Sequence, residues 1–270
     1  MIPKTIHYCW FGGNPLTAEA KACIDSWQRY CPDYEILEWN ESNFDVTQNV
    51  YCLEAYEAKK WAFVSDYARL RAVYEYGGIY MDTDVEVVRP LDSLLGHRVF
   101  MGFENDHSVS IGTFGAEKRN SAIGVFLSAY DARHFRQLDG SFDMTTNLRL
   151  VTDFLVRRYG LKLNGKKQDL ETGITVYPME AFIAKDYRTG WILQDDSTYV
   201  IHHYASSWVD EALRRREYVY RQHLRRYIRT IEPILSKCAR AHMLYEFDGG
   251  SGVLNMIKEY IGRKLNRHFV

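Results

Sequence analysis

The sequence predicts an α/β fold with a helical extension toward its C-terminal end. A strand-like run at 4–11 is followed by a helical pattern and by an alternating run at 34–39, an order typical of parallel strands joined by a helix. Short apolar runs then continue to alternate with helical patterns as far as residue 204. After Trp208 only helical periodicity remains, and this change predicts the extension.

Each expected element rests on a local pattern. Thr17 is a suitable N-cap for a helix that ends before Pro32 and whose apolar side carries Ala20, Cys23, Ile24 and Trp27. A helix at about 62–76 is stopped by Gly77-Gly78, and a short apolar strand then runs into two carboxylates. Further strands are expected near 98–104, 109–115, 174–178 and 198–204, and further helices near 120–134 and 146–159.

Composition narrows the class of protein. The 270 residues are 46% hydrophobic and 26% charged, which is ordinary for a globular protein with one sizeable core and argues against disorder. No apolar run is long enough to span a membrane and no signal-peptide pattern is present, so a cytoplasmic location is expected. The phase of the first strand places His7 and Cys9 in the interior. The cysteines form no CxxC pair, which argues against a disulfide framework and a structural zinc site: Cys9, Cys23, Cys31, Cys52 and Cys238.

Charge is distributed unevenly along the chain. From Asp210 onward there are thirteen Lys or Arg and seven Asp or Glu, whereas the preceding residues carry twenty-one basic and twenty-eight acidic side chains. We therefore expect a main domain at 1–209 and a basic amphipathic helical extension at 210–270, in which Pro233 kinks or ends the first helix. Arginines at helical spacing beside an apolar stripe favour peripheral attachment to an anionic membrane surface. The alternative is a structural helix pair with a solvated basic face.

Asp82-Thr83-Asp84 is the strongest candidate for a functional site. Two carboxylates directed at one site about 5 Å apart repel each other by about 3 kcal/mol at an effective dielectric of about 20. A divalent cation between them removes this repulsion, and hard oxygen ligands suit Mn²⁺ or Mg²⁺. The alternative is a pair of solvated acids at the end of a strand.

The segment around this pair resembles a known family. The run WAFVSDYARLRAVYEYGGIYMDTDVEVV at 61–88 resembles the sugar-binding DxD segment of family 32 glycosyltransferases, which include capsular polysaccharide synthesis enzymes and initiating mannosyltransferases. It is distantly similar to the glucosyltransferase domains of clostridial toxins. The resemblance covers about residues 2–208, through IPKTIHYCWFGG at 2–13, ITVYPMEAFIA at 174–184 and HHYASSW at 202–208. Ala184 stands where that family usually has proline.

This resemblance implies a fold and an activity. The fold is the nucleotide-sugar-binding α/β domain called GT-A, a mixed sheet with the DxD at the C-terminal end of a strand. The activity is metal-dependent sugar transfer, with retention of anomeric configuration, from a nucleotide-sugar donor to a saccharide or lipid-linked saccharide acceptor in surface polysaccharide synthesis. No nucleic-acid partner is indicated.

The resemblance also implies roles for residues near the acidic pair. Asp82 and Asp84 would bind the metal. Asp66 and Arg69 lie three residues apart on one helix face, where Asp66 would hold donor hydroxyls and Arg69 would stabilise the departing diphosphate. Of the adjacent histidines only one can face the metal, because successive side chains of a strand point to opposite faces. The family's spacing from the terminal Trp selects His203 as the third ligand.

The remaining matched positions would bind the donor. Trp10 would stack on the nucleotide base, with a core tryptophan as the alternative. Tyr80 is grouped with the donor-binding residues. Ser206, or Ser207 beside it, would contact the diphosphate, and Trp208 would cap the leaving group with its indole N–H.

Two other classes of protein stay open. A phosphohydrolase of the haloacid dehalogenase type also begins its site with a hydrophobic run and a DxD, and Gln194-Asp195-Asp196 imitates its later acidic pair. That opening normally lies near the N-terminus and is not followed by Val85-Glu86. The second alternative is a non-catalytic carbohydrate- or membrane-binding protein built on a transferase fold.

Overall fold

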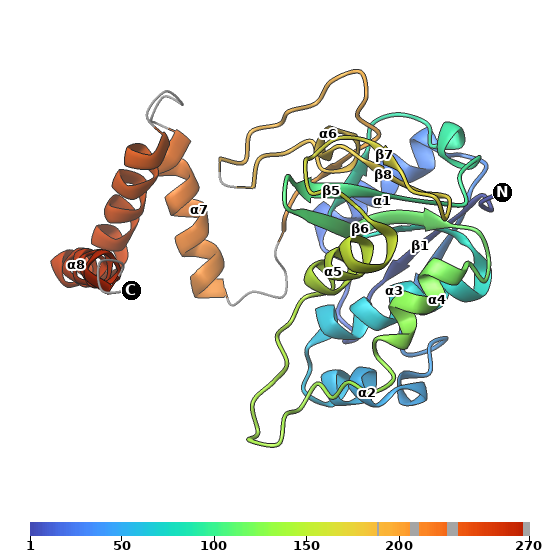
Figure 1. Ribbon diagram of the computed structural model, residues 1–270, viewed down its shortest axis with the longest axis horizontal. Helices are drawn as coiled ribbons and strands as arrows, with labels where there is room; N and C mark the ends of the chain where they lie inside the picture. The colour runs from blue at the N-terminus through green and yellow to red at the C-terminus, as the bar shows by residue number, and fades with distance from the viewer. Residues whose placement is uncertain (188, 206–210, 226–231, 267–270) are drawn as a thin grey trace. The chain divides into compact units, whose positions relative to one another are not determined.

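The structure is a computed structural model that describes residues 1–187, 189–205, 211–225 and 232–266 (Figure 1). The chain divides into two compact units. The first consists of Met1–Lys185 and Ile192–Ala205, and the second of Asp186–Trp191 and Ser206–Val270. The domain boundary expected between residues 209 and 210 lies outside the described residues.

A seven-stranded sheet forms the centre of the first unit, in the order β2-β1-β3-β6-β5-β8-β7. β1 is parallel to β2 and β3, β6 is antiparallel to both of its neighbours, β5 is parallel to β8, and β7 is antiparallel to β8. The expected mixed sheet is therefore confirmed. Its strands are β1 (Thr5–Cys9), β2 (Glu35–Trp39), β3 (Gly78–Met81), β5 (Val99–Asn105), β6 (Ser108–Ala116), β7 (Gln168–Asp169) and β8 (Ile174–Tyr177).

A second, two-stranded sheet lies beside the acidic pair. It joins β4 (Val85–Val87) to β9 (Val200–His202) in antiparallel register. The two strands come from sequence regions more than one hundred residues apart, and their pairing carries the end of the unit back to the turn after β3. This small sheet positions the candidate site.

Helices cover both faces of the central sheet (Figure 1). The alternation along β3 shows the two faces, because Tyr80 belongs to one apolar cluster while Ile79 and Met81 belong to the other. The Tyr80 side is covered by α2 (Val50–Glu57), α3 (Trp61–Tyr76), α4 (Ser121–Ser128) and α5 (Asn147–Tyr159). The other side is covered by α1 (Ala18–Tyr30) and α6 (Met179–Phe182).

Local chemistry fixes the ends of two of these helices. The Thr17 hydroxyl accepts from the Ala20 N–H at 3.1 Å, so the predicted N-cap of α1 is confirmed. α3 ends at Gly77, whose φ of +70° lies in the left-handed region, and a Cβ there would lie 2.7 Å from the Lys118 nitrogen. Glycine thus allows the chain to leave α3 and enter β3 at once.

His7 and Cys9 are both buried in the sheet, as the strand phase predicts. His7 Nε2 faces the Gly77 carbonyl oxygen at 2.7 Å, and the Trp39 indole N–H donates to His7 Nδ1 at 3.2 Å. These contacts require a neutral ring with its proton on Nε2. Burial lowers the pKa of His7 to about 4.

The second unit is built mainly of two helices, α7 (Glu211–Arg225) and α8 (Glu232–Asn266), and so confirms the expected helical extension. α8 is kinked at Gly249, the first residue of the run Gly249-Gly250-Ser251-Gly252. Pro233 lies in the first turn of α8, where a missing N–H leaves no helical hydrogen bond unmade. Arg216–Asp248 and His223–Glu246 pairs, each at 2.8 Å, link the two helices. Within the described chain, no helix has the length and hydropathy needed to cross a membrane.

Candidate metal and sugar-donor site

Asp82 and Asp84 lie in the tight turn that joins β3 to β4. The Asp82 N–H donates to the Gly112 carbonyl on β6 at 2.8 Å, and the Val85 N–H donates to the Asp82 carbonyl at 3.0 Å. Because Asp82 follows the last residue of β3, the turn lies at the C-terminal end of a strand parallel to β1. Ligands bind at such strand ends in α/β sheets.

His202 completes a group of three possible metal ligands. It is the last residue of β9 and pairs with Val85 of β4. One ligand atom from each of Asp82, Asp84 and His202 lies within 4.8 Å of the others. Carboxylate oxygens with one imidazole nitrogen form a donor set compatible with Mn²⁺. The side chains present therefore fit a divalent cation.

His203 does not join this group, and its expected position is corrected here. Its Nε2 lies 2.8 Å from Glu86 Oε2, while its backbone N–H donates to the Asp84 carbonyl at 2.8 Å. The register of β9 on β4 determines which histidine faces the acidic pair. It places His202 opposite Val85, so the side chain of His203 points to the other face. A spacing counted back from the terminal Trp does not contain this information.

Asp84 and His202 form an ion pair, with Nε2 and Oδ1 3.2 Å apart. Burial opposes a charge on the imidazole, but Asp84 outweighs it and raises the pKa of His202 to about 9. Burial also opposes the charge on Asp84, but His202 and the Ala205 N–H, which donates to Oδ2 at 2.8 Å, hold the pKa of Asp84 well below its usual range. A cation bound to these atoms requires the neutral ring and so displaces the proton.

Tyr204 shapes the loop that brings Ala205 to Asp84. Its φ of +56° lies in the left-handed region, which non-glycine residues adopt rarely. Its ring stacks on His202 with centroids 4.4 Å apart, and its hydroxyl donates to Glu104 at 2.7 Å. These contacts hold the strained residue in place and fix the orientation of the imidazole.

Arg69 connects the acidic pair to α3. Its guanidinium lies 3.1 Å from Asp66 Oδ1 and 3.2 Å from Asp82 Oδ1, and it also donates to the Ile111 carbonyl at 3.1 Å. Arg69 and Asp66 are both buried. Burial raises the pKa of Asp66 to about 6, against the lowering effect of Arg69. The predicted placement of Asp66 and Arg69 on one helix face beside the pair is what the structure shows.

Tyr80 lies behind Asp82. Its side chain is 1% exposed, its hydroxyl donates to Asp82 Oδ1 at 2.9 Å, and the Arg69 guanidinium lies 4.7 Å from its ring centroid. The structure thus gives Tyr80 a contact that orients the Asp82 carboxylate, and its contact with the donor stays a prediction.

Asn147 is a member of the site that the sequence did not indicate. It is the first residue of α5, and its side-chain amide donates to Asp66 Oδ1. Asp66 thus accepts from Asn147 and pairs with Arg69 through the same oxygen. No local pattern around Asn147 points to a partner eighty residues away, so pairing information would be needed to find it.

The other predicted donor-binding residues are placed as follows. Trp10 directly follows β1, is partly buried against the apolar cluster on the α1 side, and donates its indole N–H to the Asn14 carbonyl at 2.6 Å. Its stacking on the nucleotide base stays a prediction. Ser206, Ser207 and Trp208 lie outside the described residues.

The backbone at position 184 explains why alanine stands where the family usually has proline. It is fully buried and has a φ of +43°, whereas proline is fixed near −65°. Its N–H also donates to the Met179 carbonyl at 3.2 Å, a bond that proline cannot make. The loop after α6 therefore has a shape that requires a residue other than proline.

Comparison with known proteins agrees with this geometry. Residues 17–101, which include the acidic pair, match the family described as glycosyltransferase sugar-binding region containing DXD motif. Among curated proteins, inositol phosphoceramide mannosyltransferase 3 of Schizosaccharomyces pombe is 31% identical over 124 residues, 43% of this chain and 34% of that protein. Inositol phosphoceramide mannosyltransferase 1 of the same organism is 28% identical over 123 residues, 39% of this chain and 37% of that protein. The chain thus spans little more than a third of the length of these relatives.

Several solved structures are similar at low identity. The PaToxG glycosyltransferase is 18% identical, with a TM-score of 0.44, over 58% of this chain and 69% of its own. The galactosyltransferase LgtC, solved with donor and acceptor sugar analogues, is 12% identical, with a TM-score of 0.43, over 74% of this chain and 87% of its own. The sequence match is the stronger finding: residues 17–101 are similar to the DXD-containing sugar-binding region of glycosyltransferases, as the resemblance to family 32 predicts.

Proposed function

We propose that the protein transfers a sugar from a nucleotide-sugar donor to a saccharide or lipid-linked saccharide acceptor, with a divalent cation and with retention of anomeric configuration. One observation carries the proposal: the pairing of β9 with β4 brings His202 to Asp82 and Asp84 of the matched segment, and Asp82 adjoins a buried Asp66–Arg69 pair. Asp82, Asp84 and His202 would hold the cation, which would supply charge neutralisation for the departing diphosphate.

The chain's own residues would orient the donor sugar and stabilise the negative charge of the departing diphosphate. Asp66 would accept hydrogen bonds from the hydroxyls of the donor sugar, and Arg69 and Asn147 hold its carboxylate in place. Arg69 adds a buried positive charge next to Asp82, where negative charge grows as the diphosphate leaves.

The resemblance to family 32 implies retention, and the engagement of the carboxylates bears on the route by which retention would occur. Asp66 is paired with Arg69, Asp82 with Arg69 and Tyr80, and Asp84 with His202. None of the three is left as a nucleophile for a double displacement. We propose attack on the same face: the acceptor oxygen bonds to the anomeric carbon, the bond to the diphosphate oxygen breaks, and that oxygen takes the acceptor's proton.

The names of the relatives bear on which donor and acceptor to test first. The names of the yeast relatives describe mannosyl transfer to inositol phosphoceramide, a lipid-borne acceptor. This supports GDP-mannose beside UDP-glucose, UDP-galactose and UDP-N-acetylhexosamines as donors to test, and a lipid-linked glycan of surface polysaccharide synthesis as acceptor.

The test is nucleotide release from these four classes of donor with Mn²⁺. We expect release from at least one, its loss with a chelator, and its loss in Asp84→Asn, because an amide cannot offset the charge of the cation. Asp195→Asn is the matched control: its carboxylate accepts from Ser197 in an exposed turn, and it does not belong to the ligand group. Phosphate release from a simple phosphomonoester, without binding of a nucleoside diphosphate, would establish the phosphohydrolase alternative.

A further inference from the structure

Glu104 lies at the same edge of the central sheet as the candidate metal group, Asp82, Asp84 and His202. β3 and β5 both run antiparallel to β6, which lies between them, so these two strands end at the same edge. Asp82 directly follows β3, and Glu104 is the next-to-last residue of β5. This is the edge at which α/β sheets bind ligands. No motif identified in the sequence includes Glu104.

A β-bulge lies at Glu104. Phe103 pairs with Val109 and Asn105 with Ser108, so Glu104 has no partner of its own on β6. An extra residue of this kind bends the strand and changes the direction of its side chain, and such bulges are common beside active sites. Glu104 is half-buried. The strand thus departs from regular pairing at the residue that reaches the loop after β9.

Tyr204 connects Glu104 to the metal group. Its hydroxyl donates to Glu104 Oε1 at 2.7 Å, and its ring stacks on His202 with centroids 4.4 Å apart. Burial opposes a charge on His202, but Asp84 and, more weakly, Glu104 raise its pKa. The Glu104 carboxylate is therefore close enough to act electrostatically on a candidate metal ligand. A continuous row of contacts runs from Asp84 through His202 and Tyr204 to Glu104.

Glu104 differs from the other carboxylates of the site in its partners. Asp66, Asp82 and Asp84 each pair with a basic side chain. Within the ranges that the structure describes, Glu104 forms no ion pair and its Oε2 accepts no hydrogen bond. A half-buried carboxylate without a counter-charge is stabilised by hydroxyl groups, which form charge-assisted hydrogen bonds with it. The hydroxyls of a saccharide are donors of this kind.

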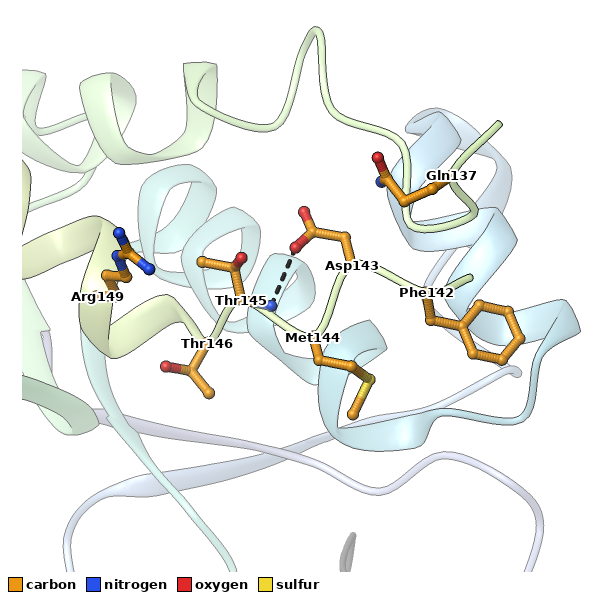
Figure 2. Close-up of a pocket in the computed structure, with 7 residues that line it drawn as sticks. All are labelled: Gln137, Phe142, Asp143, Met144, Thr145, Thr146 and Arg149. Atoms are coloured by element: carbon orange, nitrogen blue, oxygen red, sulfur yellow. Dashed lines mark hydrogen bonds between the residues drawn. The ribbon is translucent and has the colours of Figure 1, made fainter. Parts of the chain in front are cut away.

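An open depression at the start of α5 is a less suitable place for an acceptor. Its lining residues come from positions 137–149 (Figure 2). Figure 2 shows the Phe142 ring directed away from Thr145, Thr146 and Arg149, so one sugar ring cannot contact the aromatic face and these polar groups together. None of the lining residues is a member of the metal group. The sheet edge at Glu104 is therefore the better candidate.

We propose that Glu104 binds the acceptor, with its Oε2 accepting a hydrogen bond from a hydroxyl of a saccharide. The proposal rests on the proposed function, because it assigns the second substrate of the same site. Asp66 would hold the donor sugar beside Arg69. Glu104 lies at the other end of the contacts that surround the metal group. The acceptor would then lie on the Tyr204 side of that group and the donor sugar on the Asp66 side.

The test separates transfer to a sugar from transfer to water. The probes are the methyl α-glycosides of glucose, galactose, mannose and N-acetylglucosamine, given with Mn²⁺ and a nucleotide sugar from which the protein releases nucleotide. We expect Glu104→Gln to raise the KM of the accepted glycoside about tenfold, because a hydrogen bond to a charged group is lost. Donor hydrolysis without glycoside, and Mn²⁺-dependent binding of the nucleoside diphosphate, should change by less than about twofold, since the glutamine amide oxygen still accepts from Tyr204.

Two further variants distinguish this role from a structural one. Tyr204→Phe removes the hydroxyl that binds Glu104 but keeps the carboxylate and the ring stacked on His202. It should raise the KM of the glycoside by less than about threefold, whereas a Glu104 that only holds Tyr204 predicts equal effects of the two variants. Asp106→Asn is the matched control, since it removes an exposed carboxylate from the turn between β5 and β6. It should behave like the unaltered protein.

Three results would each overturn the proposal. The first is that Glu104→Gln uses glycosides as well as the unaltered protein does. The second is an equal loss in Tyr204→Phe or in Asp106→Asn, and the third is that no glycoside accepts the sugar although the donor is hydrolysed. Failure of the proposed function looks different, because the unaltered protein would then show neither metal-dependent binding of a nucleoside diphosphate nor release of nucleotide.

Discussion

Gly112 lies directly against the carboxylate of Asp82: a Cβ at position 112 would be 2.8 Å from Asp82 Oδ2 and 3.4 Å from His202 Cε1. Its φ is not in the left-handed region, so alanine would add this clash without straining the strand. We expect Gly112→Ala to weaken Mn²⁺-dependent nucleotide binding about tenfold or more, because ligand displacements of this size disrupt metal sites. Calorimetric titration of nucleotide with and without Mn²⁺ checks this. Gly124→Ala, whose Cβ would meet Tyr74 at 3.1 Å away from the site, should leave binding unchanged.

The adjacent histidines offer a paired test. His202→Ala should abolish most Mn²⁺-dependent nucleotide binding, whereas His203→Ala should reduce it by less than about threefold, because His203 contacts Glu86 and not the acidic pair. Mn²⁺ titrations of both variants measure the difference. Equal losses would show that the loop after β9 rearranges when the cation binds.

Stability should depend on pH through His7. Burial lowers the pKa of His7 from 6.5 to about 4. Between these pH values the unfolded chain binds a proton at this histidine and the native state does not. The contribution of His7 to the free energy of unfolding should therefore be at its full value above pH 6.5 and fall by about 2 kcal/mol on going to about pH 5. Because the raised pKa values of Asp66 and His202 act in the opposite direction, the contribution is measured as the difference between the unaltered protein and His7→Gln in urea unfolding at pH 7 and pH 5. His107→Gln, which changes an exposed histidine, should behave like the unaltered protein.

Ala184→Pro should destabilise the protein by about 3 kcal/mol, since proline can adopt neither the observed φ of +43° nor the hydrogen bond to Met179. Ala184→Ser keeps the N–H and serves as the control. Thermal unfolding compares the two. An unchanged melting temperature in Ala184→Pro would mean that the loop after α6 accepts the shape usual in the family.

The basic helices should bind anionic vesicles at low salt. Arg214 and Arg215 are exposed on α7, with Leu213 and Tyr218 exposed nearby. Each cation near an anionic surface contributes about 1 kcal/mol, so Arg214→Gln with Arg215→Gln should lower co-sedimentation with phosphatidylglycerol vesicles about tenfold or more. The control replaces Arg157 and Arg158, two exposed arginines of α5. If the full chain does not bind these vesicles, α7 and α8 are a structural helix pair. The expected location at the cytoplasmic face of a membrane would then lose its support.

Much of the fold could be predicted because residues close together in the sequence determine where its helices and strands begin and end. The β1-α1-β2 start, the cap at Thr17 and the glycines after α3 are all fixed by residues within a few positions. α2 was not predicted, because the residues at 50–57 carry no clear amphipathic repeat and the helix depends on Asn49, whose side chain accepts from the Cys52 N–H. α4 is shorter than expected and ends at Ser128.

The residues of the site likewise fall into those that a local pattern predicts and those that depend on distant parts of the chain. Asp66, Arg69, Asp82 and Asp84 lie in one continuous segment, and helical and strand geometry brings them together without long-range information. His202 and Asn147 reach the site through β9 and α5, from distant parts of the chain. Their positions depend on strand register and on the packing of a helix end, which no local pattern encodes. For this reason the sequence pointed to His203, whereas the structure places His202 beside the acidic pair, and it gave no sign of Asn147.

The division into units has a consequence for protein engineering. The chain crosses from one unit to the other after Lys185, returns after Trp191, and crosses again after Ala205. Tyr187, from the short inserted stretch, lies 4.4 Å from the Arg221 guanidinium of α7. A deletion after Ala205 would remove the cationic partner of Tyr187 and leave the inserted stretch attached to the first unit, so a boundary drawn at Ala205 does not separate the two units.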